Sequence, residues 1–536
     1  MKFKYLGFSL VATLIVAFSA VSCSDVWDEH YFSEPQNKSN LNLYQYISAD
    51  TTLTKFTQML RITHYDSILS QSSSYTVWAP TNASLEYVDF TDTAEVYKIV
   101  GNHVTRFSYS TSMLEGAGKL LRMFDKKLLL FEKTAGGFTF GGMPVVKPDL
   151  ATKNGIVHIL GVYVPYTFNF WEFIDQQPGL DSLKVFLNSL NTKIYDPALS
   201  FQDGVFVDSV FRNSNVILDN VAALNTEDSI YTAILPTDYA WAKAYEQIAP
   251  YFNFLPDDGG EAARRKYAKL YLLKDLFFRG KLSFPLTTST LKSTLGTKYS
   301  NPSELFDNSM KFNLSNGLAC VSYGLTLRPT ESWFDTLRFE AESATFKTNE
   351  KANYDTYIYS GVGSGYDISG GKYLYLKDVA VNGIRAPYAV FELPNTLSAA
   401  YNIYCVFAPT KMISSGDERP NKVKFFLSYV DASGKQIYNA AIDTTHQVLA
   451  GKTASTIDKF PTTDASTIFT TNPTKVDKVL VAQNVVFPFC NLLTLQNDKT
   501  TVSLAVVNAV GFKPADQLLG NRSLLIDYII LEPVVQ

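Results

Sequence analysis

The feature that most constrains the fold is an internal repeat. Residues 75–80 form a short apolar run that ends at proline, and residues 231–236 repeat both the run and its proline. An Asn-Gly pair that opens a second apolar run follows in each case, at residues 154–164 and again at residues 316–325. A repeat of about 150 residues indicates two copies of one domain, because solenoids are built from much shorter units.

Each copy opens with segments whose apolar residues have helical spacing. We therefore expect helices at residues 43–47, 56–60, 170–174 and 183–187. The runs that end at Pro80 and Pro236 are predicted to be buried strands, since proline cannot donate to the next ladder hydrogen bond. The polar residues 81–84 are typical helix N-caps, and alternation around the glycine pairs of residues 127–144 predicts a β-hairpin.

Three boxes in the first copy carry a resemblance to a known family. Residues 76–85 (TVWAPTNASL) resemble the first conserved box of fasciclin-like domains, and residues 102–104 (NHV) resemble the histidine box. Residues 154–162 (NGIVHILGV) resemble the second conserved box. In the second copy, residues 232–241 (TAILPTDYAW) match the first box with drift. The resemblance implies a protein of mostly adhesive or matrix-binding character.

The second copy diverges further. Residues 274–278 (KDLFF) are a faint counterpart of the histidine box without a histidine, and we expect Val321 where the second-box histidine belongs. The resemblance thus implies a fasciclin-like domain 1 at residues 43–167 and a divergent fasciclin-like domain 2 at residues 168–331.

The histidines of the first copy, His103 and His158, are the tempting candidates for an active site. Catalysis would require a nucleophile or a metal partner, and none stands out in the sequence. Loss of both histidines in the second copy agrees with a packing role. We therefore expect each ring to satisfy a buried hydrogen bond beside its strand.

The sequence pattern changes in residues 332–536, where short apolar runs are bounded by Pro, Gly, Asn and Asp and the apolar residues have no helical spacing. Many strands in about 200 residues predict a β-sandwich or jelly roll. The predicted fold class is therefore α+β, with two fasciclin-like α/β domains followed by an all-β domain.

The two ends of this domain, residues 339–342 (FEAE) and 524–533 (LLIDYIILEP), resemble the jelly-roll carbohydrate-binding modules of family 6 and their relatives. The resemblance implies a structural calcium held by Glu340, Glu342 and Asp527, and Ca²⁺ takes 6–8 oxygen ligands. The alternative is that these are solvated edge carboxylates. No other cofactor is expected.

A sugar site would need an aromatic platform flanked by polar groups. The best candidate is the stretch of residues 354–366, expected to be a loop, with Tyr354, Tyr357, Tyr359 and Tyr366 as ligand-binding residues. The alternative is that these rings pack the rim of the sandwich.

The amino terminus has the pattern of an export signal. Residues 1–4 are basic, residues 6–21 are apolar, and small residues precede Cys23. The cysteine at this place resembles the acylated cysteine of bacterial lipoproteins, which implies removal of residues 1–22 and a membrane anchor at Cys23. The acidic start of the linker, residues 23–42, resembles the surface-export signals of Bacteroides-type lipoproteins. An ordinary signal peptide and an address-free linker are the alternatives.

The remaining cysteines are Cys320, Cys405 and Cys490, and an odd number cannot all pair within one chain. Cys405 and Cys490 either form a disulfide or are buried free thiols. The five histidines of the chain are spread too widely to predict a zinc site.

Composition sets the remaining limits. A hydrophobic content of 46% with 18% charged residues is typical of a globular chain, and a net charge of -4 argues against nucleic acid as a partner. The sequence predicts a non-catalytic, lipid-anchored protein of the outer membrane, exposed at the cell surface, that mediates adhesion or binds extracellular glycan beside an outer-membrane transporter complex. The alternative is a structural or protein-adhesion role without sugar.

Overall fold

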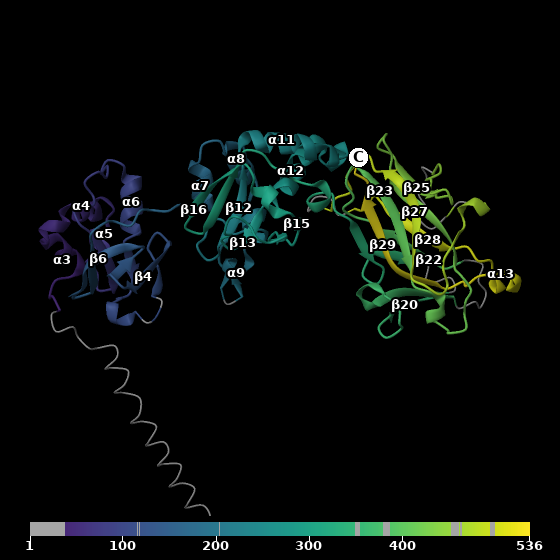
Figure 1. Cartoon of the computed structure of the whole chain (residues 1–536), viewed down its shortest axis with the longest axis horizontal. Helices are drawn as coiled ribbons and strands as arrows, with labels where there is room; N and C mark the ends of the chain where they lie inside the picture. The colour runs from purple at the N-terminus through teal and green to yellow at the C-terminus, as the bar shows by residue number, and fades with distance from the viewer. Residues whose placement is uncertain are drawn as a thin grey trace, which may run out of the picture. The chain divides into compact units, whose positions relative to one another are not determined.

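The computed structural model describes residues 38–114, 116, 118–202, 204–348, 354–378, 386–451, 460, 464–493 and 499–535. The chain divides into two compact units, shown in Figure 1. The first extends to Asn169 and includes the short segments 226–228 and 314–316, and the second holds the remaining described residues. The predicted domain limits of 43–167, 168–331 and 332–536 stay predictions. Among the described residues, no helix combines the length and apolar character that crossing a bilayer requires.

Helices and a mixed sheet make up the first unit. Its helices are α3 (Leu43–Ala49), α4 (Thr54–Ile62), α5 (Tyr65–Leu69) and α6 (Thr93–Gly101), with 3-10 turns at Thr51–Leu53 and Thr111–Met113. Its strands are β1 (Tyr75–Pro80), β2 (Val104–Arg106), β3 (Lys119–Arg122), β4 (Leu128–Thr134), β5 (Gly137–Phe140), β6 (Met143–Thr152) and β7 (Gly155–Leu160). They form one sheet in the order β2-β1-β7-β6-β5-β4-β3.

Most predicted elements of the first copy are confirmed. α3 and α4 cover the two predicted helices, and a capping box between Asn42 and Gln45 begins α3. β4 and β5 form the predicted hairpin. The helix expected directly after residues 81–84 is wrong, because the Asn82 side chain bonds Lys55 N (2.8 Å) and the Thr51 carbonyl (3.0 Å) and holds a turn there instead.

The second copy keeps the opening helices, the strand that ends at proline and the strand that follows the Asn-Gly pair in the same order, but it has additional elements between them. Its elements are α7 (Phe170–Gln176), α8 (Asp181–Ser189), β8 (Asn191–Tyr195), α9 (Pro197–Ser200), β9 (Phe201–Gln202), β10 (Val205–Phe206), β11 (Phe211–Asn215), α10 (Val216–Asn220), β12 (Tyr231–Pro236), α11 (Asp238–Ile248), α12 (Gly260–Leu273), β13 (Phe277–Arg279), β14 (Thr290–Lys292), β15 (Lys298–Ser300), β16 (Ser309–Leu314) and β17 (Gly317–Ser322). Short 3-10 helices lie at Ala249–Tyr251, Pro256–Asp258, Pro302–Phe306 and Pro329–Glu331. The central sheet has the order β13-β12-β17-β16.

The two copies share one strand register, which confirms the internal repeat. β1 runs parallel to β7 with Tyr75 opposite Gly155, and β12 runs parallel to β17 with Tyr231 opposite Gly317. Both glycines have positive φ, +157° and +152°. A Cβ at either one would lie 2.0 Å or 1.9 Å from the carbonyl oxygen of the tyrosine opposite, so both positions require glycine.

The register corrects one expectation about the second copy. His158 lies opposite Trp78 in the first copy, and the equivalent pair in the second is Cys320 opposite Ile234. Cys320, not Val321, therefore stands at the position of the second-box histidine. Counting from the shared Asn-Gly pair gives the same assignment.

The C-terminal part is a sandwich of two sheets, which confirms the α+β class with an all-β domain at its end. Its strands are β18 (Leu337–Glu340), β19 (Phe346–Thr348), β20 (Tyr354–Ser360), β21 (Lys372–Asp378), β22 (Tyr388–Glu392), β23 (Ala400–Phe407), β24 (Lys422–Val430), β25 (Gln436–Ala441), β26 (Phe469–Thr470), β27 (Asp477–Val486), β28 (Ser503–Asn508) and β29 (Leu524–Pro533). It also holds 3-10 turns at Ser369–Gly371, Thr410–Met412 and Ala465–Thr467 and the helix α13 (Pro514–Leu518).

One sheet has the order β20-β21-β29-β23-β27, with β18 also pairing β29. The other has the order β19-β22-β28-β24-β25, with β26 also pairing β24. Fully buried side chains such as Leu374, Phe391 and Phe425 alternate with residues of the outer faces, as expected for packed antiparallel sheets.

Candidate ligand-binding face and carboxylate cluster

A tyrosine face lies on the edge of the sandwich, and we define it as Tyr357, Tyr359, Tyr373 and Tyr375. The first two belong to the edge strand β20 and the other two to its neighbour β21, in the pairs Tyr357–Tyr375 and Tyr359–Tyr373. The rings of Tyr357 and Tyr359 are nearly parallel and stacked, with an interplanar angle of 17° and centroids 5.5 Å apart. They are 37% and 42% exposed, whereas Tyr373 and Tyr375 are buried.

Contacts beneath the exposed rings fix their positions. The Tyr359 ring lies 5.1 Å from Tyr375 and 6.2 Å from Tyr373 between centroids. Tyr373 and Tyr375 pack in turn against Leu525 and Ile368. Tyr373 and Tyr375 were not among the predicted site residues, although the alternating sequence of residues 372–378 (KYLYLKD) was a usable signal.

The predicted sugar-binding tyrosines are partly brought together. Tyr357 and Tyr359 lie side by side, and the half-buried Tyr366 packs against the cluster that holds Tyr373 and Tyr375. The side chain of Tyr354 lies outside the described part of the structure. The expectation of a loop over residues 354–366 is wrong for its first half, because residues 354–360 pair with β21 as a strand.

Polar groups border the tyrosine face. Tyr357 Oη donates to Asp355 Oδ2 at 3.0 Å, and this bond raises the pKa of the Tyr357 phenol. Lys377 is the exposed register partner of Asp355 on β21. A carboxylate and an ammonium group therefore flank an exposed aromatic surface, which suits a ligand with both C–H faces and hydroxyl groups.

The predicted calcium ligands Glu340, Glu342 and Asp527 gather on one side of the sandwich. Val406 pairs with Tyr528 and Phe407 with Ile526, so Asp527 is the extra residue of a β-bulge. Its backbone carbonyl accepts a hydrogen bond from Ala341 N at 2.9 Å, between the two glutamates in sequence. The side chain of Asp527 is fully buried, with Ser369 N donating to Oδ1 at 3.1 Å.

Glutamates surround this buried carboxyl group. Glu340 Oε1 accepts hydrogen bonds from Ser369 Oγ (2.7 Å) and from Arg338 Nε (2.8 Å). Glu340 Oε2 and Glu342 Oε2 are buried without a hydrogen-bond partner in the described residues. Burial raises the pKa of Asp527 to about 7, and the negative charges of both glutamates add to the rise.

The cluster has the donor chemistry that Ca²⁺ prefers, since every candidate ligand is an oxygen. Buried carboxylate oxygens that lack a partner are costly, and a cation offsets that cost. In the side-chain positions of the structure, however, no group of three or more His, Cys, Asp or Glu residues in the described ranges encloses a metal ion.

The two histidines of the first copy are structural, as predicted. His103 is fully buried, with Nδ1 donating to the Ile99 carbonyl (2.6 Å) and Nε2 accepting from Val164 N (2.9 Å). His158 Nε2 donates to the Tyr109 carbonyl at 2.8 Å and Nδ1 accepts from Asp149 N at 3.2 Å. Burial lowers the pKa of both rings, so both are neutral parts of the core.

The three described cysteines, Cys320, Cys405 and Cys490, are free and buried, so Cys405 and Cys490 do not pair. Burial raises the pKa of each thiol above its ordinary value. Cys490 Sγ donates to the Tyr251 carbonyl at 3.0 Å. Thiols in such surroundings are inert as nucleophiles. Cys23 lies outside the described residues.

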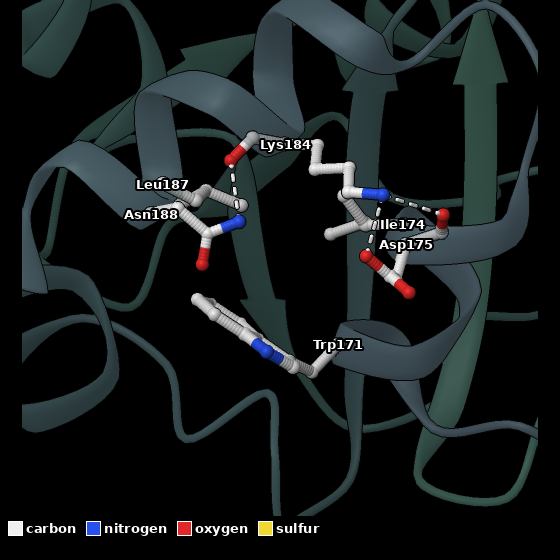
Figure 2. Close-up of a pocket in the computed structure, with 6 residues that line it drawn as sticks. All are labelled: Trp171, Ile174, Asp175, Lys184, Leu187 and Asn188. Atoms are coloured by element: carbon white, nitrogen blue, oxygen red, sulfur yellow. Dashed lines mark hydrogen bonds and ion pairs between the residues drawn. The ribbon is translucent and has the colours of Figure 1, made fainter.

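A surface pocket on α7 and α8 is shown in Figure 2. It is lined by Trp171, Ile174, Asp175, Lys184, Leu187 and Asn188. Lys184 Nζ forms an ion pair with Asp175 Oδ1 at 2.6 Å, and Asn188 Nδ2 donates to the Lys184 carbonyl at 3.0 Å. The cavity volume is about 10 Å³, which holds roughly one water molecule. We therefore place the candidate ligand site on the tyrosine face instead.

Part of the chain matches a known family model. Residues 51–162 match the family model described as Fasciclin domain, inside the predicted domain 1. No curated protein matches the chain. Among solved structures, the FAS1 domain pair of the insect cell adhesion molecule Fasciclin I is similar at 16% identity over 52% of this chain and 98% of that chain, with a TM-score of 0.21.

Two carbohydrate-binding modules are also similar. The xylan-binding domain of CBM 22 has 15% identity over 37% of this chain and 96% of that chain, with a TM-score of 0.20. The CBM35 module of Cellvibrio japonicus Abf62 has 9% identity over 38% of this chain and 95% of that chain, with a TM-score of 0.16. At these TM-scores the likenesses carry no argument about function.

Acidification should destabilise the N-terminal unit through His103. Burial lowers its pKa to about 4 in the folded chain, against about 6.5 when unfolded. The stability that depends on the neutral ring is fully present above about pH 6.5 and falls as the pH drops towards 4, by about 3 kcal/mol in all. Thermal unfolding followed by circular dichroism across this window measures the loss.

In the same experiment His103→Gln should flatten the pH dependence, whereas the exposed His64→Gln should leave it unchanged. Equal pH dependence in the wild type and in His103→Gln would contradict the assignment of the buried neutral ring.

Proposed function

We propose that this chain is a non-catalytic binding protein that holds an extracellular glycan against the tyrosine face, with the fasciclin-like domains as scaffold and adhesion surface. The observation that carries the proposal is the pair of nearly parallel, partly exposed rings of Tyr357 and Tyr359 on an edge strand. Sugar C–H faces stack on such rings, while Asp355 and Lys377 supply partners for hydroxyl groups.

Preorganisation strengthens this reading. The exposed rings rest on the buried Tyr375 and Tyr373, so little side-chain entropy is lost when a ligand stacks on them. Exposed rings on an edge strand suit a polymer better than a small molecule, which needs a concave pocket.

The environments of the histidines of the first copy and of the described cysteines favour binding without catalysis. His103 and His158 use both ring nitrogens in hydrogen bonds within the core. The thiols of Cys320, Cys405 and Cys490 are buried with raised pKa values. These groups are therefore committed to structure, and we propose no reaction.

We further propose that Cys23 carries a lipid and holds the protein at the outer membrane, exposed on the cell surface beside a glycan transporter. The support is the leader pattern before Cys23 and the acidic linker after it. Two or more acyl chains give stable anchoring where a single chain is marginal.

A structural Ca²⁺ at Glu340, Glu342 and Asp527 is the last part of the proposal. Glu340 Oε2 and Glu342 Oε2, which lack a hydrogen-bond partner in the described residues, support it. The raised pKa of Asp527 also supports it, because burial and the two neighbouring glutamates disfavour the negative charge of this carboxyl group. Arg338 is the cation that pairs with Glu340 there, and a bound metal ion would add positive charge beside the three carboxyl groups, with Ser369 Oγ as a neutral neighbour.

Loss of either exposed ring should weaken glycan binding. In affinity electrophoresis against a panel of polysaccharides, Tyr357→Ala and Tyr359→Ala should each weaken the retardation of the full chain about tenfold, or about 1.4 kcal/mol. Tyr239→Ala removes a more exposed tyrosine on α11, outside the tyrosine face, and serves as the control. No retardation of the wild type by any glycan would favour the alternative, a structural or protein-adhesion role.

Calcium should stabilise the sandwich domain. At about 100 times the dissociation constant, Ca²⁺ adds about 2.7 kcal/mol, which predicts a rise of about 5 °C in its melting temperature relative to the protein in EDTA. Asp527→Asn should remove this response, and the exposed Glu418→Gln should keep it. A calcium response that survives in Asp527→Asn, or a wild type that EDTA does not affect, would refute the site.

Acylation of Cys23 should determine where the protein resides. Cys23→Ala is expected to move it from the membrane fraction to the soluble fraction of the producing cell, whereas Ser24→Ala is the control that leaves the cysteine in place. Mass spectrometry of the amino-terminal peptide tests the modification directly, and an uncut or unmodified end would contradict it.

A further inference from the structure

We propose that an arm in the second copy, residues 191–202 and 204–215, binds the same arm of a second copy of this chain. The arm comprises β8, α9, β9, β10 and β11, of which α9 is labelled in Figure 1. The proposal is independent of glycan binding, because it uses none of the residues of the tyrosine face.

The arm is an insertion that the domain fold does not require. In the first copy, Thr63 and His64 alone connect α4 to α5. In the second copy, residues 190–215 make the equivalent connection between α8 and α10. The two ends of the arm lie side by side, since Asn191 is opposite Asn215 in the β8–β11 ladder.

Large apolar side chains cover the arm and face solvent. They are between 41% and 67% exposed: Ile194, Tyr195, Leu199, Phe201, Val205, Phe206, Val207 and Phe211. Single exposed apolar residues are ordinary, but a contiguous group of this kind marks an interaction site. A surface that the fold does not need and that water disfavours indicates a protein partner.

The arm holds its shape through its own contacts. Tyr195 and Phe211 meet at 5.8 Å between ring centroids, and Phe201 and Phe206 at 5.6 Å. Ser200 lies at the centre of the arm, where its Oγ accepts from Val210 N (2.9 Å). The apolar surface is therefore preorganised for binding, which reduces the entropy cost of association.

The distribution of charge favours a second copy over other partners. Lys193 and Arg212 lie in the β8–β11 ladder near the base, and Asp196 and Asp208 lie beyond it towards the tip. An isologous two-fold arrangement of antiparallel arms sets the basic base of one copy against the acidic tip of the other. Acidic side chains at the tip disfavour an anionic membrane surface instead.

One register of this arrangement is specific. The Val210 carbonyl points into the arm, where it accepts a hydrogen bond from Asp196 N at 2.8 Å. Because backbone groups alternate in direction along an extended chain, the N–H and C=O groups of the next residue, Phe211, point to the outer edge of the arm. In the described residues, β11 pairs with β8 alone. Antiparallel pairing of two outer edges about Val210 places Arg212 of one copy opposite Asp208 of the other.

Charge exchange tests this register. Sedimentation velocity and light scattering of the full chain, with Cys23→Ala in every variant to exclude lipid, should show a concentration-dependent dimer. Arg212→Asp and Asp208→Arg should each weaken it at least about tenfold, and the double variant should recover to within about threefold of the parent. Lys281→Asp and Asp257→Arg are matched exposed controls and should leave the dimer unchanged.

Deletion of the arm is the second test of the proposal. Replacing residues 191–214 with Gly-Ser, while Leu190 and the α10 cap Asn215 stay, should give a monomer with an unchanged melting temperature. A parent chain that is monomeric at about 100 μM, an armless chain that still dimerises, or a double variant that does not recover would each overturn the proposal. Arm-dependent binding of a monomer to lipid vesicles would also overturn it, in favour of a membrane partner.

Discussion

The structure of the repeated domains depends on one parallel strand pair, formed twice. A strand that ends at proline lies beside a strand that an Asn-Gly pair opens, in the same register in both copies. The asparagine fastens this pair to the helices: Asn154 Oδ1 accepts from Leu43 N at 2.8 Å and its Nδ2 donates to the Leu69 carbonyl at 2.9 Å. Because glycine then lies against a carbonyl oxygen, neither residue of the Asn-Gly pair can be exchanged freely.

Divergence of the second copy follows from what this strand pair needs. The backbone N–H of Trp78 bonds the His103 carbonyl, and that of Ile234 bonds the Leu276 carbonyl, so the backbone contact persists although the side chain changes. Likewise the buried Cys320 replaces His158 in the register. A buried thiol in place of a buried imidazole removes two ring nitrogens that would otherwise each need a hydrogen-bond partner.

Local signals predicted much of the fold, because the repeat, the proline and the Asn-Gly turns act over a few residues. They could not predict the turn at Asn82, whose side chain is bound by Lys55 and Thr51 on another element. Only the two β20 tyrosines of the tyrosine face were predicted, for the same reason. Their pairing with Tyr373 and Tyr375 arises from a strand register that only the folded sheet defines. The bulge at Asp527 is likewise a property of two paired strands.

The two candidate sites of the sandwich are linked through one strand. β29 carries Leu525, which supports Tyr373 and Tyr375, and two residues later Asp527, which the bulge turns into the carboxylate cluster. β21 pairs with the same stretch through Tyr375 opposite Leu525. Ser369, which bonds both Asp527 and Glu340, begins the 3-10 turn Ser369–Gly371, and this turn directly precedes the strand that bears Tyr373. A cation that ordered the carboxylates would thus also fix the turn that leads into the tyrosine face, so ligand affinity and calcium would be coupled through backbone rather than through direct contact.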